Sequence, residues 1–321
     1  MINTLKTKIR RYAVRQSTLW KLYRRANRLK VTALRGLSDE RYAKLKYREN
    51  AGGTLNLEDP QGFNEKIWWL KLNNRDPLLK ICSDKVTVRE YVKEHGYEEI
   101  LVPLVGVYEK PTDIPWDDLP DQAFIKTNNG SGTNALWRRG SGFDREAFIH
   151  TFESALEHDY YLESREWNYQ GIPPRIVVEE ILESSTGQPL LDYRFLCFEG
   201  KVELVFVDAE TAAADGTHNP EARRIVVTRG YELTGVTAKR APFDPSLAPR
   251  PENFERMVDI AETLAQRFPF CRVDLYNIDG RIYFGEITFY PGGGTQIVHP
   301  PEWEARLGSM IDLTSPRIVR K

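Results

Sequence analysis

The chain has 321 residues, 41% of them hydrophobic and 11% aromatic, which argues against wholesale disorder and fits one large or two to three small domains. The formal net charge is −1. Residues 1–50 nevertheless hold 15 Lys and Arg against 3 Asp and Glu, a local charge of +12, and the remainder holds 30 against 43, a charge of −13.

Cysteine spacing and hydropathy indicate in which cellular compartment the protein is expected. The three cysteines, Cys82, Cys197 and Cys271, are widely spaced, which suits neither a disulfide framework nor a zinc site and favours a reducing compartment. No run approaches the roughly 20 apolar residues that span a bilayer. The first residues also lack the apolar centre of a secretory signal. We therefore expect a soluble, uncleaved, cytoplasmic protein.

The first half of the chain reads mainly as helix. Apolar residues at positions 19, 22, 23, 26 and 29 mark one face of a basic amphipathic helix. A second helix is expected in FNEKIWWLKL, which starts at Phe63. A third is expected in SDKVTVREYVKEHG, with Ser83 as its N-cap and His95-Gly96 as its stop.

From about Pro103 the chain turns to short β-branched or aromatic runs, which predict strands. The expected strands are VPLVGVY, QAFIKTN, ALWRR, RIVVEEI, DYRFLCF and VELVFV. Helices are expected in DREAFIHTFESALEHDYY and PENFERMVDIAETLAQRF, and a hairpin in CRVDLYNIDGRIYFGEITFY, with its turn at Asp279-Gly280. The fold class is α+β, with mostly antiparallel connections after residue 120.

A glycine-rich segment at residues 128–134, NNGSGTN, follows a strand that ends in Lys126. Backbone N–H groups of such a turn bind anions, and the lysine adds positive charge beside a phosphate. An ordinary hairpin turn is the alternative, because glycine marks turns far more often than phosphate sites. The match to G-x-G-x-x-A is rejected as a dinucleotide fingerprint because a strand, not a helix, follows the glycines.

The C-terminal hairpin carries Asp274 on one strand and Glu286 on the other. Counting from the turn places both carboxylates near the same end of the ladder, and Arg272 shares their face by strand alternation. Paired carboxylates opposite a phosphate-binding loop suit Mg²⁺, which takes a few oxygen ligands together with substrate phosphates. The segment VVEEIL at residues 177–182 taken alone is structural.

In order, these pieces resemble the ATP-grasp superfamily. The C-terminal part, with Arg272-Val-Asp274, the Asp-Gly turn, Glu286-Ile-Thr288 and Pro291-Gly292, is similar to carboxylate-amine ligases of the D-alanine-D-alanine ligase type. From about residue 60 to 312, eight segments in fixed order resemble the TupA-like ATP-grasp family, associated with teichuronopeptide and other surface-polysaccharide biosynthesis. They are FNEKIWWLKL, SDKVTVREYV, FIKTNNGSG, SREWNY, VVEEIL, DYRFLCFEGKV, FPFCRVDLY and YFGEITFYPGGG.

The resemblance implies an ATP-grasp fold, two α+β subdomains that clamp ATP, behind a basic helical N-terminal extension. The expected divisions are 1–50 (extension), 51–120 (N-terminal helical region), 121–190 (lid subdomain) and 191–315 (C-terminal core with the metal site). The implied ATP-binding residues are Lys85, Lys126, Gly130, Ser131, Gly132, Glu179, Glu180, Leu182 and Asp192.

The resemblance also implies which residues serve phosphoryl transfer and hold Mg²⁺. Arg194, Arg224 and Arg272 stand where basic residues meet the γ phosphate or the transferring phosphoryl group. Asp274 and Glu286 align with Mg²⁺ ligands. Thr288 stands where many ligases have Asn, and this leaves open whether one or two Mg²⁺ bind.

The implied activity is ATP-dependent ligation of a carboxylate to an amine through an acyl phosphate, with an amino acid or amine joined to a uronic acid or peptide of a surface glycan. Two alternatives stay open: a kinase on the same scaffold acting on a sugar or lipid-linked hydroxyl, and a non-catalytic ATP-binding scaffold. Residues 1–50 either pack on the acidic body or attach to the anionic inner face of the membrane, near a lipid-linked glycan. Nucleic acid is not an expected partner.

Overall fold

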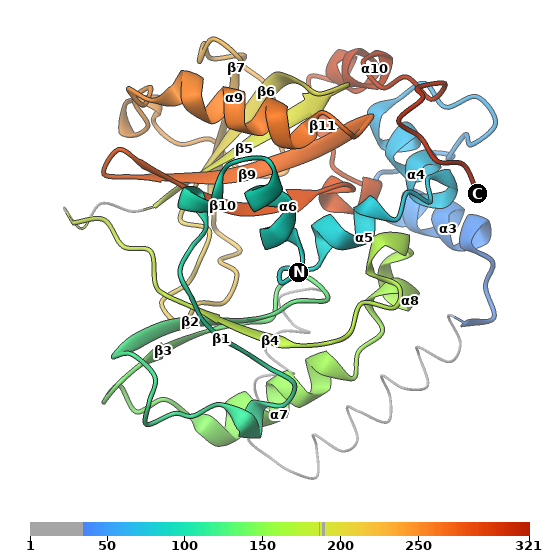
Figure 1. Cartoon of the computed structure of the whole chain (residues 1–321). Helices are drawn as coiled ribbons and strands as arrows, with labels where there is room; N and C mark the ends of the chain where they lie inside the picture. The colour runs from blue at the N-terminus through green and yellow to red at the C-terminus, as the bar shows by residue number, and fades with distance from the viewer. Residues whose placement is uncertain (1–34, 186, 188–189) are drawn as a thin grey trace.

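The structure is a computed structural model that describes residues 35–321 except 186, 188 and 189 (Figure 1). The α-helices of this part are α3 (Asp39–Asn50), α4 (Phe63–Asn73), α5 (Leu78–Ser83), α6 (Val88–Glu94), α7 (Arg145–Leu156), α8 (Tyr160–Ser164), α9 (Phe254–Ala265) and α10 (Glu302–Ser309). The strands are β1 (Leu104–Tyr108), β2 (Gln122–Thr127), β3 (Asn134–Arg138), β4 (Ile176–Glu179), β5 (Leu191–Phe198), β6 (Lys201–Ala209), β7 (Arg223–Thr228), β8 (Thr237–Ala238), β9 (Phe270–Ile278), β10 (Arg281–Thr288) and β11 (Val298–His299).

The larger sheet has five strands in the order β10-β9-β5-β6-β7, with every neighbouring pair antiparallel. Helix α9 covers one of its faces (Figure 1). Apolar residues of α9 recur at helical spacing, and Phe254, Met257, Val258, Ala261 and Leu264 are completely buried. This apolar face closes the main core, so the opposite face of the sheet is the one left for polar side chains.

The smaller sheet has four strands in the order β1-β4-β2-β3, and helix α7 packs on it (Figure 1). Its separate core joins Phe148 and Phe152 of α7 to Ile125 and Trp137 of the strands. Because β1 precedes residue 121, this sheet draws its strands from a longer stretch than 121–190. The division boundaries stay predictions.

Helices α3 and α4 pack together beside the larger sheet. Tyr42 and Ala43 of α3 are buried against Trp68 of α4. Helix α4 also contacts α10 and the Pro291–Gly294 turn that follows β10. Residues 39–50 therefore pack on the body, whereas the predicted basic helix at 19–29 lies outside the described residues.

Most predicted elements form within a few residues of their expected limits. Ser83 is a correction: it is the last residue of α5, its hydroxyl donates to the Leu79 carbonyl at 2.7 Å, and Thr87 is the N-cap of the next helix, α6. Helix α5 ends at Ser83 because the backbone of Asp84 is extended (φ −77°, ψ 116°). Strand β7 was not among the predicted strands.

Two expectations from composition can be compared with the described part of the chain. Cys82, Cys197 and Cys271 are buried and form no disulfide. Among residues 35–321, apart from the three gaps, no helix is both long and apolar enough to cross a membrane.

Candidate active site

The polar face of the larger sheet carries a row of charged side chains from three neighbouring strands. Glu286 on β10 lies directly opposite Asp274 on β9, and Asp274 lies opposite Arg194 on β5. A bulge between Phe284 and Glu286 and the turn at Asp279-Gly280, where both residues have positive φ, set this register. The expected convergence of the two carboxylates on one face is confirmed.

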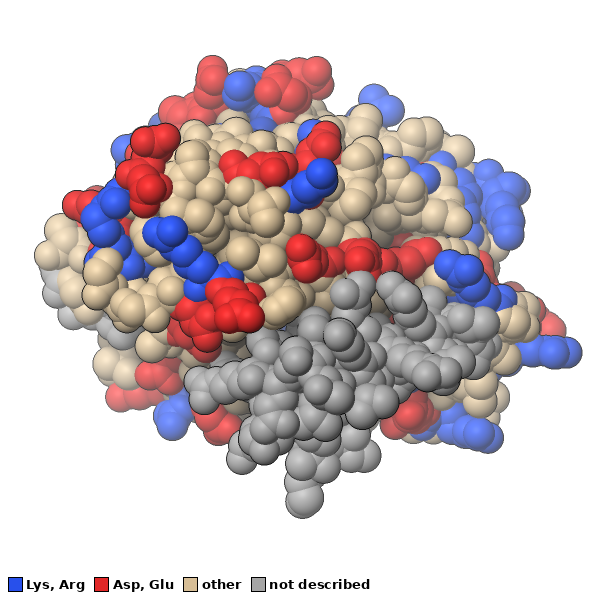
Figure 2. All heavy atoms as spheres, turned by 90° about the horizontal axis from the view of Figure 1, so that it is seen from below, with Lys and Arg blue, Asp and Glu red and all other residues tan. Residues whose placement is uncertain are grey.

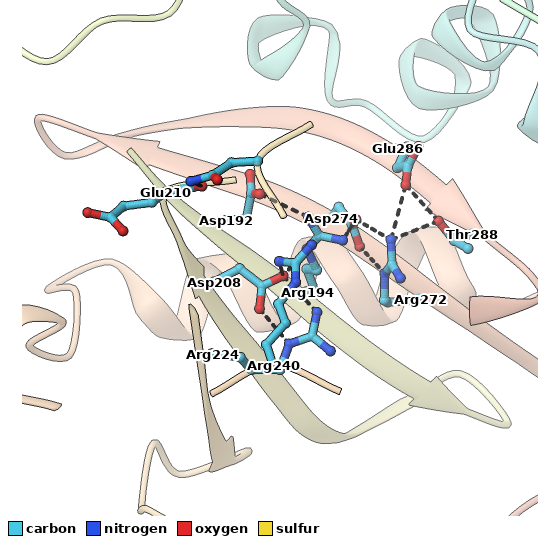
Figure 3. Close-up of polar contacts among 11 residues, drawn as sticks. Asp192, Arg194, Asp208, Glu210, Arg224, Arg240, Arg272, Asp274, Glu286 and Thr288 are labelled. Atoms are coloured by element: carbon cyan, nitrogen blue, oxygen red, sulfur yellow. Dashed lines mark hydrogen bonds and ion pairs between the residues drawn. The ribbon is translucent and has the colours of Figure 1, made fainter. Parts of the chain in front are cut away.

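Arg272 ties the two carboxylates together (Figure 3). Its Nε donates to Oδ1 of Asp274 at 2.6 Å, and its Nη2 donates to Oδ2 of Asp274 at 2.6 Å and to Oε1 of Glu286 at 3.0 Å. Thr288 joins the group, because its hydroxyl accepts from Arg272 at 3.1 Å and donates to Glu286 at 2.9 Å. A bidentate guanidinium–carboxylate pair of this kind fixes orientation as well as charge.

The two carboxyl groups differ in acidity. Burial raises the pKa of Asp274 to about 6, against the opposing influence of Arg272 and Arg194. Burial also acts to raise the pKa of Glu286, but Arg272, Lys85 and Arg194 outweigh it and hold that pKa at about 2. Glu286 is therefore the permanent anion of the pair, because three cations from different elements face it.

Asp208 on β6 forms a second cluster beside the first (Figure 3). It is completely buried and pairs with three guanidinium groups: Arg194 (Nε, 2.8 Å), Arg224 (Nη2, 2.7 Å) and Arg240. These cations outweigh the effect of burial and lower the pKa of Asp208. Arg194 also pairs with Asp192 at 2.9 Å and lies 3.7 Å from Oδ2 of Asp274, and through Asp274 it joins the Asp208 cluster to the row.

The two sheets face each other across a cleft. Its lining includes Lys126 and Glu179 of the smaller sheet, Glu286 of the larger sheet, and Lys85 and Arg89 from the α5–α6 region. Lys126 Nζ lies 2.6 Å from Oε2 of Glu179, whose other oxygen lies 3.4 Å from Arg89. One wall of the cleft thus carries Lys126 and Arg89 paired with Glu179, together with Lys85, and the other wall carries the Glu286 carboxylate.

The glycine-rich segment lies at the end of this cleft. Lys85 Nζ donates to the Gly130 carbonyl at 2.7 Å, and burial lowers the pKa of Lys85. Asn128, also in this segment, is completely buried and donates to Asp84 at 2.8 Å. The segment is therefore anchored to the residues between α5 and α6, while Ser131 is exposed and Gly132 adopts a left-handed φ of 85°.

The remaining predicted residues are placed as follows. Glu180 follows β4 with an exposed side chain, and its backbone N–H donates to Pro103 at 3.0 Å. Leu182 is partly exposed in the same connection. Arg224 is buried on β7, and its side chain is held by Asp208.

Three residues of the site were missed in the sequence. Arg89 pairs with Glu179, Asp208 is the centre of the arginine cluster, and Arg240 is one of its partners. Asp208 offered a weak signal, an acidic residue ending the apolar run VELVFV. Arg89 and Arg240 offered none, because each reaches the site only through the packing of distant segments.

The donor set suits Mg²⁺ in a nucleotide complex. Asp274 and Glu286 present carboxylate oxygens from paired positions, and the Thr288 hydroxyl lies beside them. Mg²⁺ is commonly held by one or two carboxylates together with substrate phosphates. Within the described residues, no group of three or more His, Cys, Asp or Glu side chains forms a metal cage. The site therefore fits an ion shared with a phosphate better than a purely protein-bound ion.

Three solved structures with similar folds are distant in sequence. L-amino acid ligase from Bacillus licheniformis is 16% identical, with a TM-score of 0.42, over 66% of this chain and 44% of that one. D-alanine–D-alanine ligase from Bacillus anthracis, complexed with ATP, is 16% identical, with a TM-score of 0.40, over 75% and 66%. The Helicobacter pylori D-alanine–D-alanine ligase is 12% identical, with a TM-score of 0.41, over 80% and 68%. This chain thus spans less than half of the first protein and about two thirds of the others.

Sequence comparison is more decisive than these structural similarities, which are too distant to carry an argument about function. No curated protein matches the chain. A family model described as TupA-like ATPgrasp matches residues 65–312, more than three quarters of the chain. The expected α+β ATP-grasp fold is confirmed, and the chain belongs to the TupA-like ATPgrasp family.

Proposed function

We propose that this protein is an ATP-dependent ligase that joins a carboxylate to an amine. The observation that carries the proposal is the pairing of Glu286 with Asp274, with Arg272 bound to both, across a cleft from Lys126 and Lys85. A nucleotide in this cleft has cations for its phosphates on one side and metal-binding carboxylates on the other. Family membership supports ATP as that nucleotide.

In the proposed reaction, a carboxylate oxygen of the substrate attacks the γ phosphorus of ATP, and ADP leaves. The amine nitrogen then attacks the acyl carbon of the resulting acyl phosphate, phosphate leaves, and an amide forms with loss of one proton from nitrogen. The protein supplies positioning and electrostatic stabilisation. Lys126 and Lys85 bind the phosphates, and Arg272 and Arg194 stabilise negative charge on the transferring phosphoryl group.

Asp274 and Glu286 would hold Mg²⁺, with Thr288 as a neutral neighbour. When bound, the ion neutralises phosphate charge and orients the transferring group. Arg272 has a second role in this arrangement, because its contacts with both carboxylates keep their oxygens turned to one side of the sheet. In the proposed site, Glu179 and Asp192 lie on the nucleoside side.

A product assay tests the proposal. The full chain is incubated with ATP, Mg²⁺ and pairs of carboxylates and amines, including amino acids and uronic acids, and ADP release and products are followed by mass spectrometry. We expect an amide and free phosphate in equal amounts. A phosphorylated hydroxyl acceptor would identify a kinase instead, and absence of ATP consumption with every pair would favour a binding scaffold.

The family resemblance extends this proposal to the substrate. We propose that the carboxylate belongs to a uronic acid or peptide of a surface glycan, and that residues 1–34, with ten basic and no acidic residues, bring the enzyme to the anionic inner face of the membrane. Each basic residue near such a surface contributes about 1 kcal/mol of binding free energy. A lipid-linked glycan would be met at that surface.

A further inference from the structure

Glu166 is a buried carboxylate without a partner. It follows α8 and begins the short helix η3 (Trp167–Tyr169), and only 8% of its surface is exposed. No donor among the described residues lies within hydrogen-bond or ion-pair distance of its side chain. Leaving a carboxylate in this state is unfavourable, since buried charges are normally paired. Such a residue calls for a ligand that supplies the missing charge.

The nearest cation, Lys71 of α4, has its own partners. Its Nζ donates to the carbonyls of Ser164 at 3.0 Å and Gly293 at 2.8 Å, and it lies 3.7 Å from the ring centre of Trp68. These contacts occupy the ammonium and leave the Glu166 carboxylate beyond ion-pair distance. Lys71 therefore lowers the local cost of the negative charge without binding it.

Gly293 leaves an open space between these two groups. A β-carbon built on Gly293 would lie 3.8 Å from Lys71 Nζ and 3.9 Å from Glu166 Oε1, with no closer contact. Gly293 also has a left-handed φ of 66°, which suits glycine. Gly293 therefore leaves room for a small group beside both Lys71 and Glu166.

Three tyrosines lie close enough to Glu166 for its charge to contribute to raising their pKa values: Tyr160, Tyr169 and Tyr290. The rings of Tyr160 and Tyr169 meet edge to face at 4.8 Å, Tyr160 packs on Gly130, and Tyr169 lines the same cleft as Glu286. The hydroxyl of Tyr290 is buried with no hydrogen-bond partner among the described residues. Burial raises the pKa of Glu166 to about 7, with Lys71 opposing and Glu286 adding to the rise, which shows that these groups are close enough to interact.

A carboxylate amid aromatic rings and an unused hydroxyl matches a primary ammonium. The cation forms a charge-assisted hydrogen bond to the carboxylate and is attracted to tyrosine rings, whereas a phosphate or carboxylate would be repelled. We propose that Glu166 binds the ammonium group of the amine substrate, with Tyr160, Tyr169 and Tyr290 around it, and accepts one of its protons so that the neutral amine attacks the acyl phosphate. This inference rests on the proposed ligase function and places the amine beside Glu286, next to the transferring phosphoryl group.

The experiment measures ammonium binding directly. The full chain is titrated with fluoropropylammonium by fluorine NMR, with and without a non-hydrolysable ATP analogue and Mg²⁺. Fluoropropanol is the neutral probe. We expect wild-type protein to bind the ammonium and not the alcohol, and Glu166→Gln to weaken ammonium binding at least about tenfold, since a hydrogen bond to a charged group is lost. Glu163→Gln, a matched charge change at a half-exposed position of α8 that pairs with His158, should bind like wild type.

Nucleotide affinity by calorimetry and melting temperature report the fold of each variant. Gly293→Ala is a second variant, which fills the open space while keeping the carboxylate, and it should also weaken ammonium binding. Equal ammonium binding by wild type and Glu166→Gln, equal binding of the alcohol, or no binding by wild type would overturn the inference. Ammonium binding through Glu166 together with no amide from any substrate pair would instead defeat the proposed function alone.

Discussion

Buried carboxylates of this chain meet very different numbers of cations. Asp208 meets three guanidinium groups, Asp274 is held by Arg272 in a bidentate pair, and Glu166 meets no cation of the described part of the chain. A charge that is fully paired stabilises the fold and fixes its neighbours, whereas an unpaired one destabilises it until a ligand arrives. The number of partners therefore separates the fully paired Asp208 from Glu166.

Neutralising either carboxylate of the row should stop catalysis. We expect Asp274→Asn or Glu286→Gln to lower the ATP turnover rate at least about 100-fold, because charge placed for the transition state is lost and Arg272 loses a partner. Stopped or continuous ADP-release assays check this. Glu203→Gln, an exposed carboxylate on β6, is the control and should keep wild-type turnover. Normal turnover in either site variant would refute the assignment of Asp274 and Glu286.

The unpaired state of Glu166 predicts a pH-dependent stability. Its pKa is raised in the folded state from 4.5 to about 7, so the folded protein binds more protons than the unfolded chain between these values. This contribution is fully present below pH 4.5 and is lost as the pH rises through about 7. This contribution to the free energy of unfolding changes by at most about 1.4 kcal/mol per pH unit, and Glu166→Gln removes it.

Urea unfolding of wild type and Glu166→Gln at pH 5 and pH 8 measures this difference. The variant should gain stability relative to wild type at pH 8. If the difference in unfolding free energy between wild type and Glu166→Gln were the same at pH 5 and pH 8, ionisation of Glu166 would not destabilise the folded protein.

At the scale of elements, strand pairing assembles the charged row and helix packing closes the core behind it. The three strands that carry Glu286, Asp274 and Arg194 are neighbours in one sheet, so side chains far apart in sequence share one face. The apolar face of α9 holds the opposite side of that sheet. The Pro291–Gly294 turn, which follows β10, packs against α4, and its Gly293 lies beside Glu166.

The contact between α10 and α4 depends on Gly308. A β-carbon at this position would lie 2.1 Å from the Gln61 carbonyl oxygen and 2.8 Å from the carbonyl carbon of Gly62, both backbone atoms that cannot turn aside. We expect Gly308→Ala to lower the free energy of unfolding by about 1–3 kcal/mol or more through this overlap. Chemical unfolding checks the value.

The neighbouring, exposed Ser309→Ala serves as the control and should change stability by no more than about 0.5 kcal/mol. Similar stability of wild type and Gly308→Ala would show that α10 shifts freely against α4. Neither residue belongs to the cleft, so nucleotide binding should survive both substitutions.

At the scale of the molecule, charge is divided between residues 1–50, with a net charge of +12, and residues 51–321, with a net charge of −13. The described surface seen from below, on the side of the smaller sheet, carries both acidic and basic side chains, with no single sign covering it (Figure 2). The excess of basic residues is concentrated in residues 1–34 of the sequence, where ten are Lys or Arg. Membrane attachment by this segment is therefore testable separately from catalysis.

Sedimentation with liposomes compares the full chain with a chain lacking residues 1–34, which retains α3. We expect the full chain to bind vesicles containing anionic lipid and to be released by salt, since screening weakens attraction to the surface. The shortened chain should stay in solution and keep its nucleotide affinity. Equal sedimentation of the two chains would end the membrane proposal.

The sequence by itself determined the residue types of the site and much of its local geometry. Counting from the Asp279-Gly280 turn placed Asp274 and Glu286 near the same end of the ladder, and strand alternation placed Arg272 on the face of Asp274. The bulge between Phe284 and Glu286, which brings Glu286 directly opposite Asp274, came only from the structure. Eight short segments in order also predicted the family. These signals are local, so the sequence carries them without knowledge of packing.

Only the tertiary structure decided which charges are paired and which are left free. Arg240 reaches Asp208 from 32 positions away, Arg89 reaches Glu179 from 90, and Lys71 meets Gly293 but not Glu166. Burial and distance set these outcomes, and both depend on how the two sheets and the α4 region pack together. A sequence shows that a carboxylate exists, but whether a cation lies within reach of it is a property of the folded chain.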